Sequence, residues 1–273
     1  MNKKFLVILV AAAVLIAAGI FSSIAYANHS WGEYHWARTA NPFNLNLGDN
    51  VSSAWDPFLV TTSGDWSASS VLDTAIVAGG TTSDPKKCRP TTGRVEVCNA
   101  NYGGAWLGLA QIWVSGKHIY QATSKMNDFY FNKAKYNTPA WRQFVMCQEV
   151  GHAFGLDHQD EISNNANLGS CMDYTNDPDG GVGGASATDP SNEHPNTHDY
   201  DQLDTIYAHL EASISAVSKK FLAPANTNAN DIDTSDAKEW GKVIRKSNDG
   251  RSSLHERDLG KGNKIFTFVI WAD

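Results

Sequence analysis

The sequence predicts an α+β protein, in which strands come first, two helices follow and a further group of strands ends the chain. Four or five short runs of β-branched and aromatic residues precede the first strong helix pattern. Both helix patterns have recognisable start signals, and the last runs are separated by glycine-containing turns. Strands and helices that occupy separate stretches of the chain are typical of this class.

The strand predictions rest on hydrophobic periodicity. Phe43–Leu47 alternates strictly between apolar and polar residues, as a half-buried strand does. A helix is expected over about Val51–Val60. The runs of residues that predict the next strands are Val71–Val77, Arg94–Asn99, Leu107–Val114 and Ile119–Met126.

The two strong helices are predicted from their ends. Thr138 is a good N-cap, and Pro139 is tolerated at the first helical position because its missing N–H has no partner there. The pattern continues over Ala140–Phe154, and Gly155 supplies the left-handed residue that ends many helices. A second amphipathic helix is expected from Asn196 or Thr197 to about Leu210.

The N-terminal stretch predicts export. Lys3 and Lys4 precede the apolar run Phe5–Ile20, and Ala25-Tyr26-Ala27 is the small-x-small pattern that signal peptidase cuts after. We therefore expect a signal peptide over residues 1–27, whose removal changes the formal charge from −7 to −9. An uncleaved membrane anchor is the alternative.

The rest of the chain divides by composition. Residues 28–215 are expected to form the main domain, residues 216–237 a linker rich in small and polar residues, and residues 238–273 a small β-rich tail. The strands expected in the tail are Trp240–Lys246, Ser253–Leu259 and Lys264–Trp271. Because so short a segment buries little surface alone, we expect it to pack on the main domain. Trp240 and Trp271 are candidates for a surface that stacks on a sugar.

Composition excludes several classes of partner. The chain has 22 Lys and Arg against 29 Asp and Glu, and no basic run, so it lacks the charge pattern of nucleic-acid binding or of docking on anionic lipid. Its 42% hydrophobic content suffices for a core. We expect a secreted, extracellular monomer with no membrane contact after signal cleavage.

Export also determines how the four cysteines are interpreted. An even number of cysteines in an oxidising compartment favours disulfides over metal thiolates. We expect Cys88–Cys98, which closes a short loop, and Cys147–Cys171, which joins the two segments that carry the chemistry described next. Four cysteines allow three pairings, so the alternatives stay open.

The end of the first strong helix carries the most informative pattern. Gln148 and His152 are one helical turn apart, so they emerge on the same face, with Glu149 beside them. Gly155 allows a sharp backbone turn that brings His158 back toward that face. Two imidazoles, a third donor and an adjacent carboxylate are what a catalytic zinc site requires.

This pattern resembles the metzincin metallopeptidases, whose signature is HExxHxxGxxH followed by a Met-containing turn. Glu149, His152, Gly155 and His158 match in register, and Ser170–Tyr174 is similar to the Met-turn. The resemblance is nearest to the matrixin-like branch. It implies a twisted mixed sheet of about five strands, an active-site helix, a Met-turn and a C-terminal helix, here followed by the small C-terminal β meander.

The resemblance also implies the roles of individual residues. His152, His158 and Gln148 would hold one catalytic Zn²⁺, and Glu149 would be the general base that takes a proton from a zinc-activated water and delivers it to the leaving amine. Tyr174 stands where some branches place a tyrosine against the metal or the developing oxyanion. Met172 would form an apolar floor beneath the metal.

One position departs from the family pattern, because Gln148 replaces the usual first histidine. A glutamine carbonyl oxygen is a poorer zinc donor than imidazole, so weaker zinc retention is expected. The other interpretation is that Gln148 is a polar helix residue that makes a hydrogen bond near the metal without binding it.

Two further expectations concern binding. Leu107–Val114 resembles the edge strand on which such enzymes lay an extended peptide. Asp177 and Asp179 are candidates for a Ca²⁺ site, with a plain Asp/Gly turn as the alternative.

Two functional hypotheses follow. The first is a secreted zinc-dependent metalloendopeptidase with a peptide or protein substrate. The second is a catalytically inactive secreted protein that binds a peptide or a polysaccharide.

Overall fold

The computed structural model of the chain describes residues 29–81, 84–181, 188–212 and 235–272. The predicted signal peptide and residues 216–234 of the predicted linker lie outside these ranges. The strands are β1 (His35–Trp36), β2 (Phe43–Asn50), β3 (Leu72–Ala78), β4 (Arg94–Ala100), β5 (Trp106–Ser115), β6 (His118–Asn127), β7 (Lys242–Lys246), β8 (Ser252–Gly260) and β9 (Asn263–Trp271). The helices are α2 (Asp56–Trp66), α3 (Asp128–Phe131), α4 (Pro139–His152), α5 (Thr197–Ile206) and the short 3₁₀ helix η1 (Ala237–Glu239).

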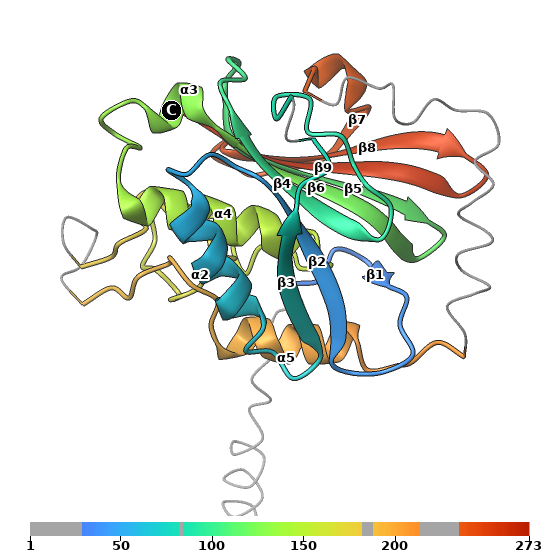
Figure 1. Ribbon diagram of the computed structural model, residues 1–273. Helices are drawn as coiled ribbons and strands as arrows, with labels where there is room; N and C mark the ends of the chain where they lie inside the picture. The colour runs from blue at the N-terminus through green and yellow to red at the C-terminus, as the bar shows by residue number, and fades with distance from the viewer. Residues whose placement is uncertain (1–28, 82–83, 182–187, 213–234, 273) are drawn as a thin grey trace, which may run out of the picture.

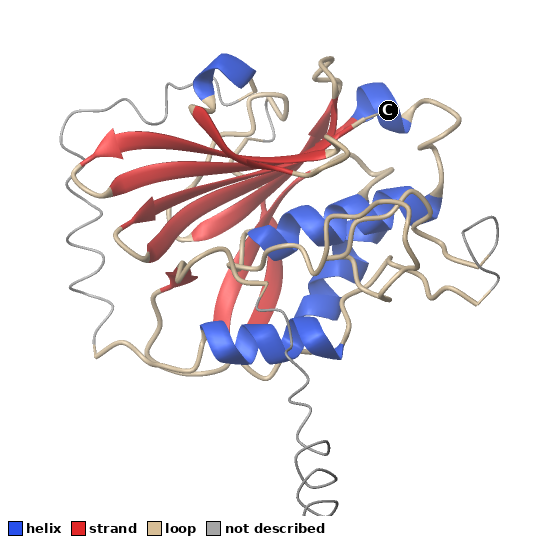
Figure 2. Cartoon of the chain, turned by 180° about the vertical axis from the view of Figure 1, so that it is seen from behind, coloured by secondary structure: helices blue, strands red, loops and turns tan. Residues whose placement is uncertain are grey.

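The described strands form one nine-stranded mixed sheet, so the α+β class is confirmed. Its order is β3-β2-β4-β6-β5-β9-β8-β7, and β1 pairs with β6 away from this path. Strands β2, β3, β4 and β6 are parallel to one another, whereas β5 and the strands beyond it are antiparallel. Helices α2 and α4 lie against one face of the sheet (Figure 1), and Figure 2 shows the same layering from behind.

The tail continues the sheet of the main body. Strand β9 pairs with β5 along its whole length, from Trp106 opposite Trp271 to Ser115 opposite Asn263. The expected edge strand Leu107–Val114 is therefore an interior strand, and that prediction is wrong. The cause is apolar burial: β9 contributes Phe266, Phe268 and Ile270 to the same core cluster that β5 contributes to.

Trp240 is buried as well. It is 1% exposed and packs with Trp106, Leu109 and Val269 in a second, smaller core cluster. Since Trp271 also packs against this cluster, the two tail tryptophans do not form the exposed stacking surface considered above. They hold the tail to the sheet instead.

Some helix boundaries differ from those expected. The first helix was expected over Val51–Val60 but occupies Asp56–Trp66, because Pro57 lies in its first turn, where a proline favours a helix start. Helix α4 begins as predicted, with the Thr138 side chain accepting a hydrogen bond from the backbone of Trp141. Helix α5 ends at Ile206, four residues before the expected end.

The structure contains the disulfides Cys88–Cys98 and Cys147–Cys171, which is the predicted pairing. The second bridge joins α4 to the segment that follows His158. Within the described ranges, no helix is long and apolar enough to cross a bilayer.

Candidate metal centre

The last turn of α4 and the turn after it bring two histidines together. Gly155 has a φ of +100°, and a Cβ at this position would stand 2.5 Å from the Tyr34 carbonyl oxygen. Only glycine fits a backbone that is both left-handed and this close to a neighbour. The turn carries His158 back against His152, so that the two Nε2 atoms lie 3.0 Å apart. We call these two residues the inner pair.

Hydrogen bonds fix which nitrogen of each ring carries a proton. His152 Nδ1 lies 2.8 Å from the Leu156 carbonyl oxygen, and His158 Nδ1 lies 3.2 Å from Glu161 Oε1. Both oxygens only accept hydrogen bonds, so each Nδ1 carries the hydrogen and each neutral ring presents a lone pair at Nε2. The hydrogen bond from His158 also lowers the pKa of Glu161, which keeps this acceptor ionised.

Two lone pairs facing each other at 3.0 Å need a cation between or beside them. A proton is disfavoured, because burial lowers the pKa of His152 well below its usual value. A tetrahedral metal at about 2.0 Å from each nitrogen would separate its ligands by about 3.3 Å, close to the observed spacing. The donor set therefore fits a zinc ion.

Gln148 lies one helical turn before His152 and is fully buried. Its Nε2 donates to the carbonyl oxygen of Cys171 at 2.8 Å, which leaves its Oε1 buried with no hydrogen-bond partner among the described residues. A buried acceptor without a partner is costly. This hydrogen bond fixes the amide, and the carbonyl oxygen stays available as a ligand.

Glu149 is the second polar group here without a partner. Within the described ranges neither carboxylate oxygen accepts a hydrogen bond, and burial raises the pKa of this side chain well above its usual value. Strand β5 passes close by, since a Cβ at Gly108 would stand 2.4 Å from Glu149 Oε1. Glycine at this position makes room for the Glu149 carboxyl, which has no hydrogen-bond partner among the described residues.

The segment Ser170–Tyr174 lies beneath α4. Met172 is fully buried, with its Sδ beside Gly151, and the Cys147–Cys171 disulfide ties it to the helix. The Tyr174 ring meets the edge of His158, with centroids 4.8 Å apart. Its hydroxyl donates to the carbonyl oxygen of Arg251 at 2.9 Å, and burial, then the charge of Glu149, raises its pKa well above the usual value.

The tail covers the inner pair. The Phe268 ring of β9 stacks on His152 with centroids 4.1 Å apart and an interplanar angle of 14°. His152 is 0% exposed and His158 is 9% exposed. The tail therefore shields the inner pair from solvent.

Arg245 of β7 holds the tail to the loop after α4. Its guanidinium binds both carboxylate oxygens of Asp157, one at 2.6 Å, and lies 3.2 Å from Glu161 Oε1. Although burial alone would raise the pKa of Asp157, the hydrogen bond from Arg245 lowers it. Asp157, His158 and Glu161 form a three-donor group, in which Arg245 pairs with both carboxylates.

The sequence patterns did not indicate the two tail residues that close the site. Arg245 and Asp157 are 88 positions apart in the chain, and neither β7 nor β9 has a local motif that marks a contact with α4. The residues considered for Ca²⁺, Asp177 and Asp179, belong to none of the three-donor groups found in the described part of the chain. No finding supports a calcium site there.

No family model matches the chain, and no curated protein matches it. Among solved structures, the chain is similar to high choriolytic enzyme 1, a hatching enzyme zinc-protease from the medaka fish Oryzias latipes. The TM-score is 0.36 at 10% sequence identity, with 65% of this chain and 96% of that chain covered. A similarity this weak does not indicate an activity for this chain. Evidence for an activity has to come from the chain's own residues.

Proposed function

We propose that this protein is a secreted zinc-dependent metalloendopeptidase. The observation that carries the proposal is the inner pair, whose two Nε2 lone pairs converge at 3.0 Å beside a buried carboxyl that has no hydrogen-bond partner within the described ranges. A structural histidine pair would need no such carboxyl next to it. A hydrolytic centre needs one as a base.

Three residues would hold the metal: His152, His158 and the carbonyl oxygen of Gln148. Zinc, when bound, supplies a Lewis acid that polarises a substrate carbonyl and acidifies water. The hydrogen bonds at Leu156 and Glu161 orient the two imidazoles, as outer contacts of metal-binding histidines do. The glutamine donor predicts weaker retention of the metal than a third histidine would give.

Glu149 is the group that moves protons. It takes a proton from the attacking water and delivers it to the leaving amine, which requires a carboxylate that is close to the reacting atoms and has no other partner. Tyr174 is a candidate for stabilising the developing oxyanion, because its ring already contacts His158. Its hydroxyl must first leave the carbonyl oxygen of Arg251.

Activity requires displacement of the tail. In the described conformation β9 occupies the side of β5 on which an extended peptide would add, and Phe268 covers His152. The tail thus acts as a bound peptide supplied by the chain itself. The protein is then latent until the tail moves away. Arg245 must release the loop after α4, and Phe268 must uncover the inner pair.

The test uses the full chain and two variants that loosen the tail, Arg245→Ala and Phe268→Ala. Each is assayed for cleavage of a denatured, fluorescently labelled protein with and without chelator, alone and combined with Glu149→Gln. We expect the tail variants to cleave and Glu149→Gln to reduce their rate by about 10²- to 10⁴-fold. Lys264→Ala is the matched control, since its ion pair with Glu256 lies within the tail.

The enclosed site also favours the second candidate, an inactive binding protein whose cleft is filled by its own tail. That function is the correct one if both tail variants bind zinc but cleave nothing that Glu149→Gln does not also cleave.

A further inference from the structure

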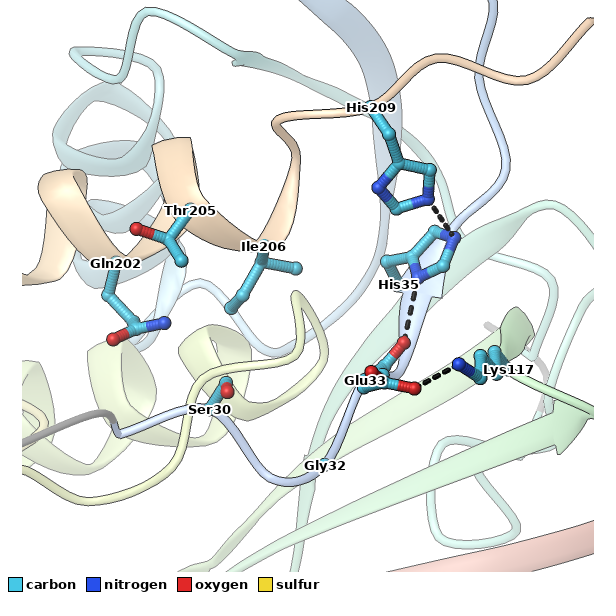
Figure 3. A pocket seen from close by; sticks show the side chains of 9 residues that line it. All are labelled: Ser30, Gly32, Glu33, His35, Lys117, Gln202, Thr205, Ile206 and His209. Carbon is cyan, nitrogen blue, oxygen red and sulfur yellow. Dashed lines mark hydrogen bonds and ion pairs between the residues drawn. The ribbon is translucent and has the colours of Figure 1, made fainter.

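A second cluster of histidines lies away from the inner pair, where β1, the start of β6 and the segment after α5 meet. It consists of His35, His118, His209 and Glu211, and we call it the outer cluster. His35 and His209 line a pocket of about 380 Å³ (Figure 3), which also contains the ion pair of Glu33 and Lys117.

Three imidazoles of the outer cluster converge on one carboxylate oxygen. Glu211 Oε1 lies 3.2 Å from His35 Nε2, 3.3 Å from His118 Nε2 and 3.5 Å from His209 Nε2. The Nε2 atoms of His35 and His209 are 3.1 Å apart. These spacings match the separations of about 3.3 Å between ligands of a tetrahedral metal ion.

His35 shows why a cation belongs in this cluster. Its Nδ1 lies 2.8 Å from the carbonyl oxygen of Glu33, so Nδ1 carries the hydrogen and Nε2 of the neutral ring presents a lone pair. That lone pair faces a carboxylate oxygen and a second imidazole nitrogen. His35 is 4% exposed, so this lone pair is shielded from water.

The backbone around the cluster is fixed. His35 and His118 are register partners in the β1–β6 pair, so their side chains are held as neighbours. Arg38 donates to the carbonyl oxygens of Tyr207 and His209, and its own carbonyl oxygen accepts from the backbone N–H of Glu211. The donors are therefore presented by backbone segments that other contacts already hold in place.

We propose that the outer cluster is a second metal site, which binds a divalent transition metal such as zinc through His35, His209 and Glu211, with His118 in contact with the Glu211 carboxylate. The donor atoms of the first three lie within 4.8 Å of one another. A set of two imidazoles and one carboxylate suits zinc better than Mg²⁺ or Ca²⁺, which prefer oxygen ligands. The role is structural: the metal joins segments that are far apart in the sequence.

The position of the cluster allows the metal to enter from solvent. The side chain of His209 is 55% exposed, whereas that of His35 is 5% exposed. Lys117 adds no uncompensated positive charge, because Glu33 neutralises it. The site does not depend on the proposed peptidase activity, since it shares no residue with the inner pair.

The experiment measures the metal content of the full chain after it is stripped with a chelator and reloaded with Zn²⁺, and repeats the titration with Co²⁺, whose visible spectrum reports tetrahedral nitrogen and oxygen coordination. We expect two equivalents of zinc in the wild type, and one in either His209→Ala or Glu211→Gln. A His152→Ala/His158→Ala variant isolates the outer cluster and should keep one equivalent.

His194→Ala is the matched control, because His194 also pairs with a carboxylate, Asp65, at 2.7 Å but belongs to no three-donor group in the described part of the chain. It should bind as much metal as the wild type. The proposal is wrong if Glu211→Gln and His209→Ala bind as much zinc as the wild type, or if the His152→Ala/His158→Ala variant binds none. One equivalent that is lost only with His152 and His158 would reject the outer site while supporting the proposed function.

Discussion

The inner pair and the outer cluster bring the same chemical groups together in different ways. In both, a hydrogen bond at Nδ1 leaves a lone pair on Nε2, and in both two Nε2 atoms lie about 3 Å apart. They differ in where the carboxylate lies. Glu211 is in contact with all three histidines of the outer cluster, whereas within the described ranges Glu149 has no hydrogen-bond partner.

The position of the carboxylate indicates which role each cluster is suited for. A carboxylate among the ligands adds charge and holds the metal more tightly, which suits a structural site. A carboxylate left outside the ligand set stays available to accept a proton, at the cost of a buried group without a partner. The two clusters also differ in exposure, since the inner pair lies beneath the tail and the side chain of His209 is largely exposed.

The largest expected effect comes from the disulfide beside the inner pair. Cys147→Ala/Cys171→Ala opens a loop of 24 residues and should lower the free energy of unfolding by about 3 kcal/mol. Because this bridge holds Met172 under α4, the variant should also lose zinc from the inner pair. Chemical denaturation and metal analysis measure the two effects.

Cys88→Ala/Cys98→Ala is the matched control, since this bridge closes a loop of 10 residues on another part of the sheet. It should lower stability and leave both metal sites loaded. Equal zinc loss in the two disulfide variants would contradict the supporting role of Cys147–Cys171.

The next effect concerns Gln148. Gln148→His should tighten zinc binding at the inner pair by about tenfold to a hundredfold, because imidazole is a better donor than an amide oxygen. The measurement is competition with a chromophoric chelator in a Glu211→Gln background, which removes the outer cluster from the titration. An affinity that stays the same would show that residue 148 is not a ligand and only donates to Cys171.

Local patterns were sufficient to predict much of the inner pair. Glu149, His152 and His158 lie within ten positions of one another, and helical geometry with one glycine turn determines how they meet. The strands β2 to β6 and the capped start of α4 were also predicted, because each depends on nearby residues. The two disulfides were predicted from the even number of cysteines in an oxidising compartment. The roles of Glu149, His152 and His158 in catalysis remain proposals.

Contacts between distant segments explain what the sequence did not predict. The pairing of β9 with β5 depends on which apolar faces meet in the folded chain, and no local pattern in either strand predicts this pairing. The outer cluster joins positions 35, 118, 209 and 211, which only the β1–β6 pairing and the end of α5 bring together. No local motif in the sequence marks His35 or His118 as a ligand.

A smaller effect tests how far the tail protects the inner pair. Arg245→Ala removes the guanidinium that binds Asp157 and Glu161, so a chelator should remove inner zinc about tenfold faster than from the wild type. Zinc at the outer cluster should leave at an unchanged rate. Stopped-flow measurements on Arg245→Ala and on the Lys264→Ala control separate the two phases, and a uniform change in both would argue against local protection.

The smallest effect lies in the turn that supports the inner pair, at Asp173. Burial, with the charge of Asp160 adding to it, raises the pKa of Asp173 to about 7. A carboxyl whose pKa is higher in the folded than in the unfolded chain contributes stability that is complete below its unfolded pKa, near 4, and is lost as the pH rises through about 7. The free energy of unfolding should therefore fall over this range of pH.

Asp173→Asn keeps a neutral side chain at every pH, and its amide oxygen accepts the hydrogen bonds that Leu168 and Asn192 now donate to Asp173 Oδ2. This variant should be more stable than the wild type above pH 7 by roughly 1 kcal/mol, with a smaller decline between pH 4 and 7. Denaturation at a series of pH values measures both. Since Asp173 contacts no residue of the outer cluster in the described structure, metal binding there should not change. If the stability of Asp173→Asn varies with pH as that of the wild type does, Asp173 is ionised in the folded protein at neutral pH.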